Sequence, residues 1–368
     1  MKRPGDLRRA QRTGRSDSPW RPRRRGVVGV LIAAALALTA CGEGSAGQDE
    51  RPSDRTVVDL AGREVRLPET IDSVATVGLV PPVNSIVFAV GQSEKIVNGP
   101  PGGYSETYAN YEFLAPHLVD APELEAAINE PVNDEELLKL APDVVIASGL
   151  EMAEGVADLG IPSVVIDPTD PEGVKESVTL LGEVFDQQEH AADYVAYFDK
   201  AVRRLKDTSA ELGEPGEPTL LYVSVSDPIR RPSRTIDWGA QMLGAASVTA
   251  DVTRDGWYEF GVEQILDWDP EVIIAMFPSD KETLMTDPRF ASLQAVQNDR
   301  IHVTPTGAQL WGQTTSENPL GLLWLAKTVR PERTEDLDMT EETRDFYDRF
   351  FQVELTDDEI QTMLEPNA

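Results

Sequence analysis

One stretch of this chain occurs twice, and the repeat limits the folds that are open to it. Residues 135–146 (EELLKLAPDVVI) align without a gap with residues 263–274 (EQILDWDPEVII). In each copy an amphipathic helical turn ends near a proline, which cannot continue a helix, and a Val/Ile run follows. Such a run is typical of a strand that is buried on both faces of a parallel sheet. The repeat therefore predicts two equivalent lobes, each built around a parallel sheet.

Other segments extend both predicted lobes. Strands are expected at residues 73–77, 163–166, 219–225 and 301–304, and a short helix at residues 83–90. Strands that alternate with helices predict the α/β class, here as two parallel-sheet, Rossmann-like lobes with a ligand cleft between them. A hairpin that turns at Gly62 is expected before the first lobe. We place the N-terminal lobe at residues 56–170 and the C-terminal lobe at residues 213–368.

The segment between the lobes has the longest helical periodicity in the chain. Apolar residues recur at steps near 3.6 from Val178 to Leu205, after an Asp170-Pro171 start signal. Gly213 and Pro215 mark the exit. We therefore expect a single linking helix over residues 171–212, about 50 Å long at a rise of 1.5 Å per residue. Joined by one such helix, the lobes would rock only slightly around the cleft.

The amino-terminal segment has the order of a secretory signal. A basic region that ends at Arg25 runs into an uncharged apolar stretch and then into Cys41, which is the single cysteine of the chain. The apolar stretch is shorter than the roughly 20 residues that span a bilayer. We interpret residues 1–40 as a signal peptide and residues 41–55 as a flexible tether. Arg24-Arg25 also fits a twin-arginine signal loosely, so the export route stays open.

Composition excludes several classes of function. The chain has 64 acidic and 33 basic residues, and ten of the basic ones lie in the predicted signal peptide. A body this acidic repels phosphate backbones and anionic bilayers, which argues against nucleic-acid binding. One cysteine permits no disulfide within the chain, and three histidines are too few for a typical dedicated zinc site. No intrinsic cofactor or metal is expected.

The order of these features resembles the helical-backbone class of ABC-transporter substrate-binding lipoproteins. The resemblance rests on Leu38-Thr39-Ala40-Cys41, which is similar to a lipobox, on the doubled motif, and on residues 311–327. It implies a monomer that is anchored by lipid on Cys41 to the extracytoplasmic face of the cell membrane. A permease and an ATPase would be its partners. Members carry iron siderophores, haem, cobalamin or oxyanions such as molybdate, and we expect a ferric siderophore. In this class one glutamate per lobe contacts permease arginines, and Glu135 and Glu263 are the matching positions.

Candidate ligand contacts follow from the rule that ligands bind beyond the carboxyl ends of parallel strands. The cluster Arg230-Arg231-Pro-Ser-Arg234 comes shortly after one predicted strand, and guanidinium groups suit carboxylate, catecholate or oxyanion ligands. Such a cluster also occurs as a solvated loop that balances nearby acids. Aromatic residues could form a wall for a bulky chelate, and the candidates are Tyr104, Trp257, Tyr258 and Trp311. His302 lies inside a strand, and we interpret it as structural.

Two other functions are weighed against transport. An anchored extracellular enzyme is disfavoured, because the chain has no Gly-x-Ser-x-Gly, His-Glu-x-x-His or phosphate-loop motif. Paired catalytic acids are not singled out among so many carboxylates. A binding protein that reports to a sensor instead of a transporter would have the same sequence features.

The first prediction concerns Cys41. We expect the native protein to begin at this residue and to carry two or more acyl chains, since one chain binds membranes only marginally. Mass spectrometry of the native amino terminus tests this, and a Cys41→Ser variant should lose the lipid. An uncut chain with an unmodified thiol would contradict the prediction.

Overall fold

The structure, a computed structural model, describes residues 55–101, 108–124, 132–209, 216–252 and 257–366. All of these belong to one compact unit, Glu50–Ala368. The predicted signal peptide and Cys41 lie outside the described residues.

The N-terminal lobe is built on a parallel three-stranded sheet in the order β3-β4-β5. Its strands are β3 (Val74–Val77), β4 (Val144–Ala147) and β5 (Ser163–Val165). All of their residues are buried, and alternate side chains such as Val144 and Val145 enter different apolar clusters on the two faces. The helices of this lobe are α1 (Val80–Ala89), α4 (Asp134–Leu140) and α5 (Leu150–Asp158). The predicted hairpin is present as β1 (Arg55–Val58) and β2 (Glu64–Leu67), which pair antiparallel.

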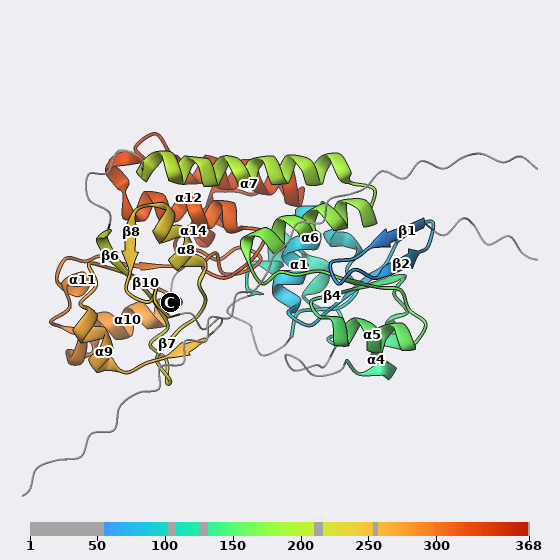
Figure 1. The fold of residues 1–368 in the computed structure, drawn as a ribbon, viewed down its shortest axis with the longest axis horizontal. Coiled ribbons are helices and arrows are strands. Elements are labelled where there is room, and N and C mark those ends of the chain that lie inside the picture. Colours follow the sequence, from blue (N-terminus) through green and yellow to red (C-terminus); the bar gives the residue numbers. More distant parts are fainter. Residues whose placement is uncertain (1–54, 102–107, 125–131, 210–215, 253–256, 367–368) are drawn as a thin grey trace, which may run out of the picture. The chain divides into compact units, whose positions relative to one another are not determined.

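The C-terminal lobe has a parallel four-stranded sheet in the order β11-β10-β6-β8. Its strands are β6 (Gly216–Val223), β8 (Ala245–Ser247), β10 (Val272–Ala275) and β11 (Ile301–Val303). A two-stranded antiparallel ribbon, β7 (Arg230–Arg231) with β9 (Tyr258–Glu259), lies beside it. The helices between its strands include α8 (Thr235–Met242), α9 (Val262–Trp268) and α10 (Pro278–Thr286). Two parallel sheets flanked by helices confirm the predicted α/β class (Figure 1).

The sequence repeat is also a structural repeat. In one lobe α4 precedes β4, and in the other α9 precedes β10. Both helices end at a residue in the left-handed conformation, Ala141 with φ 47° and Asp269 with φ 40°. These two residues hold equivalent positions of the repeat, directly before its prolines. The two copies therefore present their helices with the same local geometry.

The prediction of a single linking helix is wrong. The segment forms two helices, α6 (Pro171–Val184) and α7 (Gln188–Ser209), which pack against each other (Figure 1). The break falls at Asp186, whose φ of 57° is left-handed and therefore incompatible with a continuous right-handed helix. Gly182 permits the close crossing, because a Cβ there would lie 2.6 Å from the Cβ of Ala191. The lobes are thus joined by a helical hairpin.

The carboxyl-terminal helices complete the junction between the lobes. They are α12 (Asn318–Val329), α13 (Met339–Phe346), a π-helical turn η5 (Tyr347–Phe351) and α14 (Asp357–Leu364). One apolar cluster extends from α1 through α6 and α7 to these helices. Within it the rings of Phe88 and Phe351 are 5.5 Å apart, and those of Tyr194 and Phe350 are 5.4 Å apart. The end of the chain therefore packs on elements of the N-terminal lobe.

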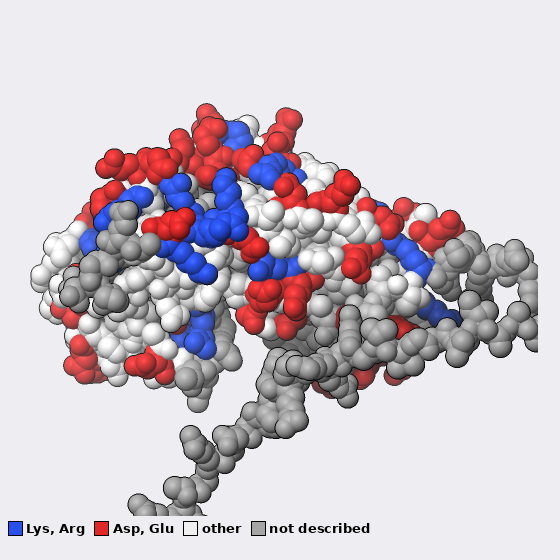
Figure 2. Space-filling model, turned by 45° about the horizontal axis from the view of Figure 1, so that its top comes forward, with Lys and Arg blue, Asp and Glu red and all other residues white. Residues whose placement is uncertain are grey.

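Short helical turns connect the larger elements. They are η1 (Ser93–Lys95), α3 (Tyr111–Leu114), η2 (Pro116–Leu118), η3 (Pro288–Phe290), α11 (Gln294–Gln297) and η4 (Pro331–Arg333). Within the described residues, none of the helices combines the length and the apolar character needed to cross a membrane. Figure 2 shows acidic side chains spread over the face that carries α7, with Lys and Arg gathered in a smaller area among them. This distribution agrees with the acidic composition.

The second prediction uses two glycines of the N-terminal lobe and its linker as a matched pair. Gly182→Ala should destabilise the fold by about 1–3 kcal/mol, because the new methyl group overlaps Ala191 at the α6–α7 crossing. Gly155→Ala in α5 should instead stabilise it by roughly 0.5–1 kcal/mol, since a Cβ there has no neighbour within 4 Å. Urea unfolding of both variants provides the measurement. Equal shifts of the same sign would contradict the tight crossing.

Candidate binding cleft

A cleft of ≈ 1710 Å³ lies between the lobes and is lined by both of them. The N-terminal lobe contributes residues 78–82, which follow β3, and residues 168–171, which follow β5. The C-terminal lobe contributes Arg230, residues 232–235, Met276 and Phe277 after β10, and the loop residues Gln309, Leu310, Gln313 and Thr314. Both lobes thus present the carboxyl ends of parallel strands, where ligands of open α/β sheets bind.

Four helices begin at the cleft, namely α1, α6, α8 and α10. The amino-terminal end of a helix carries a partial positive charge, so their convergence favours an anion. The start of α6 is capped by Asp170, whose side chain accepts a hydrogen bond from the Gly173 amide at 2.8 Å. Helix α1 begins at Val80, and its second and third residues, Pro81 and Pro82, have no N–H to donate. The start of α8 has no side-chain cap.

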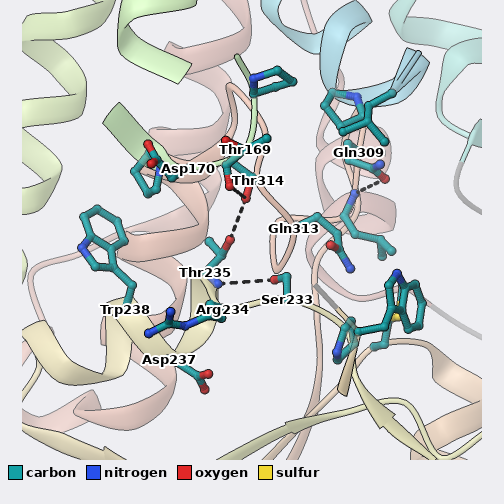
Figure 3. Close-up of a pocket in the computed structure, with 18 of the residues that line it drawn as sticks. Thr169, Asp170, Ser233, Arg234, Thr235, Asp237, Trp238, Gln309, Gln313 and Thr314 are labelled. Carbon is teal, nitrogen blue, oxygen red and sulfur yellow. Dashed lines mark hydrogen bonds between the residues drawn. The ribbon is translucent and has the colours of Figure 1, made fainter. Parts of the chain in front are cut away.

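Two of the three predicted arginines line the cleft. Arg230 packs its guanidinium carbon 3.7 Å from the ring centroid of Trp257, which also lines the cleft. Arg234 is exposed at the start of α8 (Figure 3). The structure therefore brings together Arg230, Arg234 and Trp257 of the predicted contacts.

Arg231 does not line the cleft, so we no longer propose that it contacts the ligand. Its side chain is fully buried and forms an ion pair with Asp237 at 3.0 Å. Asp237 itself lines the cleft and also accepts hydrogen bonds from Ser247 at 2.5 Å and Thr249 at 3.0 Å. From its buried position Arg231 thus offsets the negative charge of Asp237, which faces the cleft.

The predicted aromatic wall is formed in part by other residues. Trp311 is 1% exposed and donates its indole N–H to Glu317, so it belongs to the core. Tyr258 lies in β9 and contacts Phe260, and it does not line the cleft. Tyr104 lies outside the described residues. The sequence analysis did not single out Trp238, although it follows the arginine cluster by four positions and lines the cleft.

Polar side chains at the cleft floor were also missed. The hydroxyl of Thr314 donates to the carbonyl of Thr169 at 3.4 Å and lies 3.2 Å from the hydroxyl of Thr235 (Figure 3). Gln309 and Gln313 come from the same loop as Thr314. Gln313 and Thr314 lie in the family-like stretch that starts at Trp311, whereas Gln309 precedes it and had no signal in the sequence. These contacts join the N-terminal lobe to the C-terminal lobe beneath the cleft.

A buried carboxylate holds this loop in place. Glu317 is fully buried and accepts hydrogen bonds from the amides of Ala308 and Gln309, both at 2.9 Å. It also accepts from the indole of Trp311 at 3.3 Å and from the hydroxyl of Tyr347. A Cβ on Gly307 would lie 1.7 Å from a Glu317 oxygen, so only glycine fits there. Burial raises the pKa of Glu317 to about 7, although its hydrogen bonds oppose the shift.

The same loop is bonded to the N-terminal lobe. Ser316 donates its hydroxyl to the Ser85 carbonyl at 2.6 Å, and Thr315 donates to the Ser85 hydroxyl at 3.0 Å. Asn110 donates its side-chain amide to the carbonyl of Thr306 at 2.5 Å. The bonds to Ser85 tie α1 to the residues just before α12, and the Asn110 bond ties the N-terminal lobe to the residues after β11.

The structure offers no dedicated metal centre among the described residues, where no three His, Cys, Asp or Glu side chains are grouped for one. His302 lies in β11, and burial lowers its pKa. Glu135 and Glu263 are exposed on α4 and α9 and do not line the cleft.

Comparison with known proteins gives consistent matches over most of the chain. The family described as periplasmic binding protein matches residues 83–307. The molybdate-binding protein MolA of Haemophilus influenzae is 26% identical over 81% of this chain and 91% of its own. An uncharacterized ABC transporter substrate-binding lipoprotein of Bacillus subtilis, YvrC, is 21% identical over 78% of this chain and 94% of its own. The crystal structure of a periplasmic solute binding protein from Veillonella parvula has a TM-score of 0.74 and 29% identity, covering 84% of this chain and 96% of that one.

The third prediction concerns the titration of Glu317. Its folded pKa of about 7 lies above the unfolded value, so the folded state holds the proton longer as pH rises. The free energy of unfolding should therefore fall by about 3 kcal/mol between roughly pH 4.5 and pH 7 from this group alone.

A Glu317→Gln variant isolates this effect, because the amide does not titrate. The variant is expected to be less stable at all pH values, since its NH₂ group opposes a backbone donor. Its urea-unfolding profile should nevertheless lack the decline toward neutral pH. Parallel profiles for wild type and variant would show that the carboxyl group titrates normally.

Proposed function

Because this chain belongs to the periplasmic binding protein family, we propose that its cleft captures an anionic metal chelate. Its relatives are extracytoplasmic solute-binding components of ABC transporters, and they are not enzymes. The chain is accordingly a solute-binding protein that delivers its substrate to an ABC importer, with a permease and an ATPase as partners. The ligand class and the individual contacts are the proposed part.

The observation that carries the proposal is the electrostatic character of the cleft. Arg230 and Arg234 line it together with the starts of α1 and α8, whereas the start of α6 is capped by Asp170 and the N-cap amide of α10 donates to Asp280. Of its two carboxylates, Asp237 is paired with Arg231, and Asp170 is engaged as the cap of α6. Although the chain has a net charge of −31, the guanidinium groups that line the cleft suit a ligand with carboxylate, catecholate or hydroxamate oxygens.

The size and lining of the cleft favour a bulky ligand. Its volume of ≈ 1710 Å³ exceeds the roughly 300–1,000 Å³ of common small-molecule sites. Trp238, Trp257 and Phe277 supply flat apolar surfaces beside the arginines. A ferric siderophore combines an anionic metal centre with an organic frame and fits both features.

Molybdate is the second candidate. The observation that favours it is the similarity to MolA, whose name records molybdate binding, over 81% of this chain. Hydroxyl and amide donors such as Thr235, Thr314 and Gln313 suit a tetrahedral oxyanion. An oxyanion would occupy a small part of the cleft unless the lobes close around it.

The remaining assignments concern location and docking. We propose that lipid on Cys41 anchors the protein to the outer surface of the cytoplasmic membrane. Glu135 and Glu263 would contact cationic side chains of the permease, and their exposure in equivalent helices supports this role.

The fourth prediction tests the ligand class. Purified protein should bind at least one of ferric hydroxamate, ferric catecholate, ferric citrate, haem, cobalamin, molybdate or tungstate in calorimetric titrations. Arg230→Gln combined with Arg234→Gln should weaken that binding at least about tenfold, because each charged hydrogen bond contributes about 1.5–3 kcal/mol.

Arg203→Gln is the matched control, since Arg203 is exposed on α7 and does not line the cleft. It should leave the affinity unchanged. Tight binding of free Zn²⁺, Mn²⁺ or Fe³⁺ without a response to any chelate or oxyanion would contradict the proposal.

A further inference from the structure

Two exposed leucines occupy the same position of the structural repeat. Leu138 in α4 is 52% exposed and Leu266 in α9 is 36% exposed. They belong to seven large apolar side chains that are exposed among the described residues, and no other pair of these is related by the repeat. Single exposed leucines are ordinary in soluble proteins. Exposure of a leucine at the same position of both copies suggests that the two leucines contact the same partner.

Each leucine lies beside an exposed carboxylate. Leu138 follows Glu135 by three residues, and Leu266 follows Glu263 by three residues, so each pair lies on one helix face. In Figure 1 both helices lie on the side of the two lobes opposite α7. The molecule therefore presents two patches on one side, one on each lobe, and each patch contains an exposed glutamate and an exposed leucine.

The core does not need these leucines. The preceding residues, Leu137 and Ile265, are fully buried and fill the inward position of each helix. A polar residue in place of Leu138 or Leu266 should consequently leave the fold intact. This separation makes the outward positions testable without disturbing the cleft, which neither leucine lines.

We propose that Leu138 and Leu266 are apolar anchors that dock the protein onto its permease. The partner is a membrane protein with two equivalent hollows, each apolar and flanked by a cationic side chain. Charge complementarity carries this choice, because an acidic patch selects a cationic partner and repels an anionic bilayer or a second copy of this chain. Seated in the hollow, each leucine excludes water from the adjoining ion pair and so strengthens it. The inference rests on the proposed docking through Glu135 and Glu263.

The experiment measures binding of purified protein to its permease–ATPase complex in lipid nanodiscs. Leu138→Ser combined with Leu266→Ser should weaken binding at least about tenfold at both low and high salt. Glu135→Ala combined with Glu263→Ala should weaken binding at about 50 mM salt, and this effect should shrink at about 500 mM, where exposed charges are screened. Calorimetric affinity for the cleft ligand should stay within a few-fold of wild type in both variants.

Two double variants serve as controls. The first changes one residue in each lobe, and the second changes two residues on the opposite side of the molecule. Val58→Ser with Met285→Ser removes exposed apolar groups at positions that the repeat does not relate. Glu189→Ala with Glu332→Ala removes two exposed acids from the side that carries α7 and η4. Both should bind the transporter as wild type does.

The outcomes separate this inference from the proposed function. If wild type binds no transporter, the proposed docking fails and the inference fails with it. If the glutamate variant loses binding and the leucine variant keeps it, the docking stands and the leucine anchors are refuted. Equal losses in the Val58/Met285 control would refute the assigned position. Loss of wild-type self-association or of binding to phosphatidylglycerol vesicles in the leucine variant, with normal transporter binding, would assign the leucines to another partner.

Discussion

The junction between the lobes depends on the hydrogen bonds that the buried carboxylate of Glu317 accepts. A carboxylate without water is costly unless donors surround it, and here they come from Ala308, Gln309, Trp311 and Tyr347. These donors span the loop that lines the cleft and the turn near the end of the chain. The polar network around Glu317 therefore fixes the position of the loop at the cleft floor. Hydrogen bonds to Ser85 connect this loop to α1.

Residues outside the cleft also influence its charge. Arg231 is fully buried and offsets the charge of Asp237, so the two cleft arginines need not do so. Arg230 is held against Trp257, which restricts its guanidinium and reduces the entropy that a bound anion would have to overcome. The start of α8, which no side chain caps, adds a partial positive charge that needs no reorganisation on binding. The cleft of this acidic protein thus presents arginines whose positions are set by neighbouring side chains.

Much of the architecture is predictable because it depends on local patterns. The repeat at residues 135–146 and 263–274 gave the helix–proline–strand units, and the buried Val/Ile runs gave both parallel sheets. The helical hairpin was missed because Gly182 and Asp186 interrupt an apolar period that is otherwise regular. Arg230 and Arg231 could not be distinguished before the ribbon β7 was known, since neighbouring residues of a strand point to opposite faces. Trp311 and the floor residues depend on long-range packing around Glu317, which no local pattern records.

The bonds between Ser85 and residues 315–316 have a consequence for how the protein is made. Contacts this distant in sequence cannot form until most of the chain has left the ribosome or the export channel. The ring of Phe88 meets Phe351 later still. Until then Phe88 lacks its contact with Phe351, although α1 already has β3 and α6 as neighbours. The contacts that join the two lobes through the carboxyl-terminal helices therefore form late in folding, when nearly the whole chain is available.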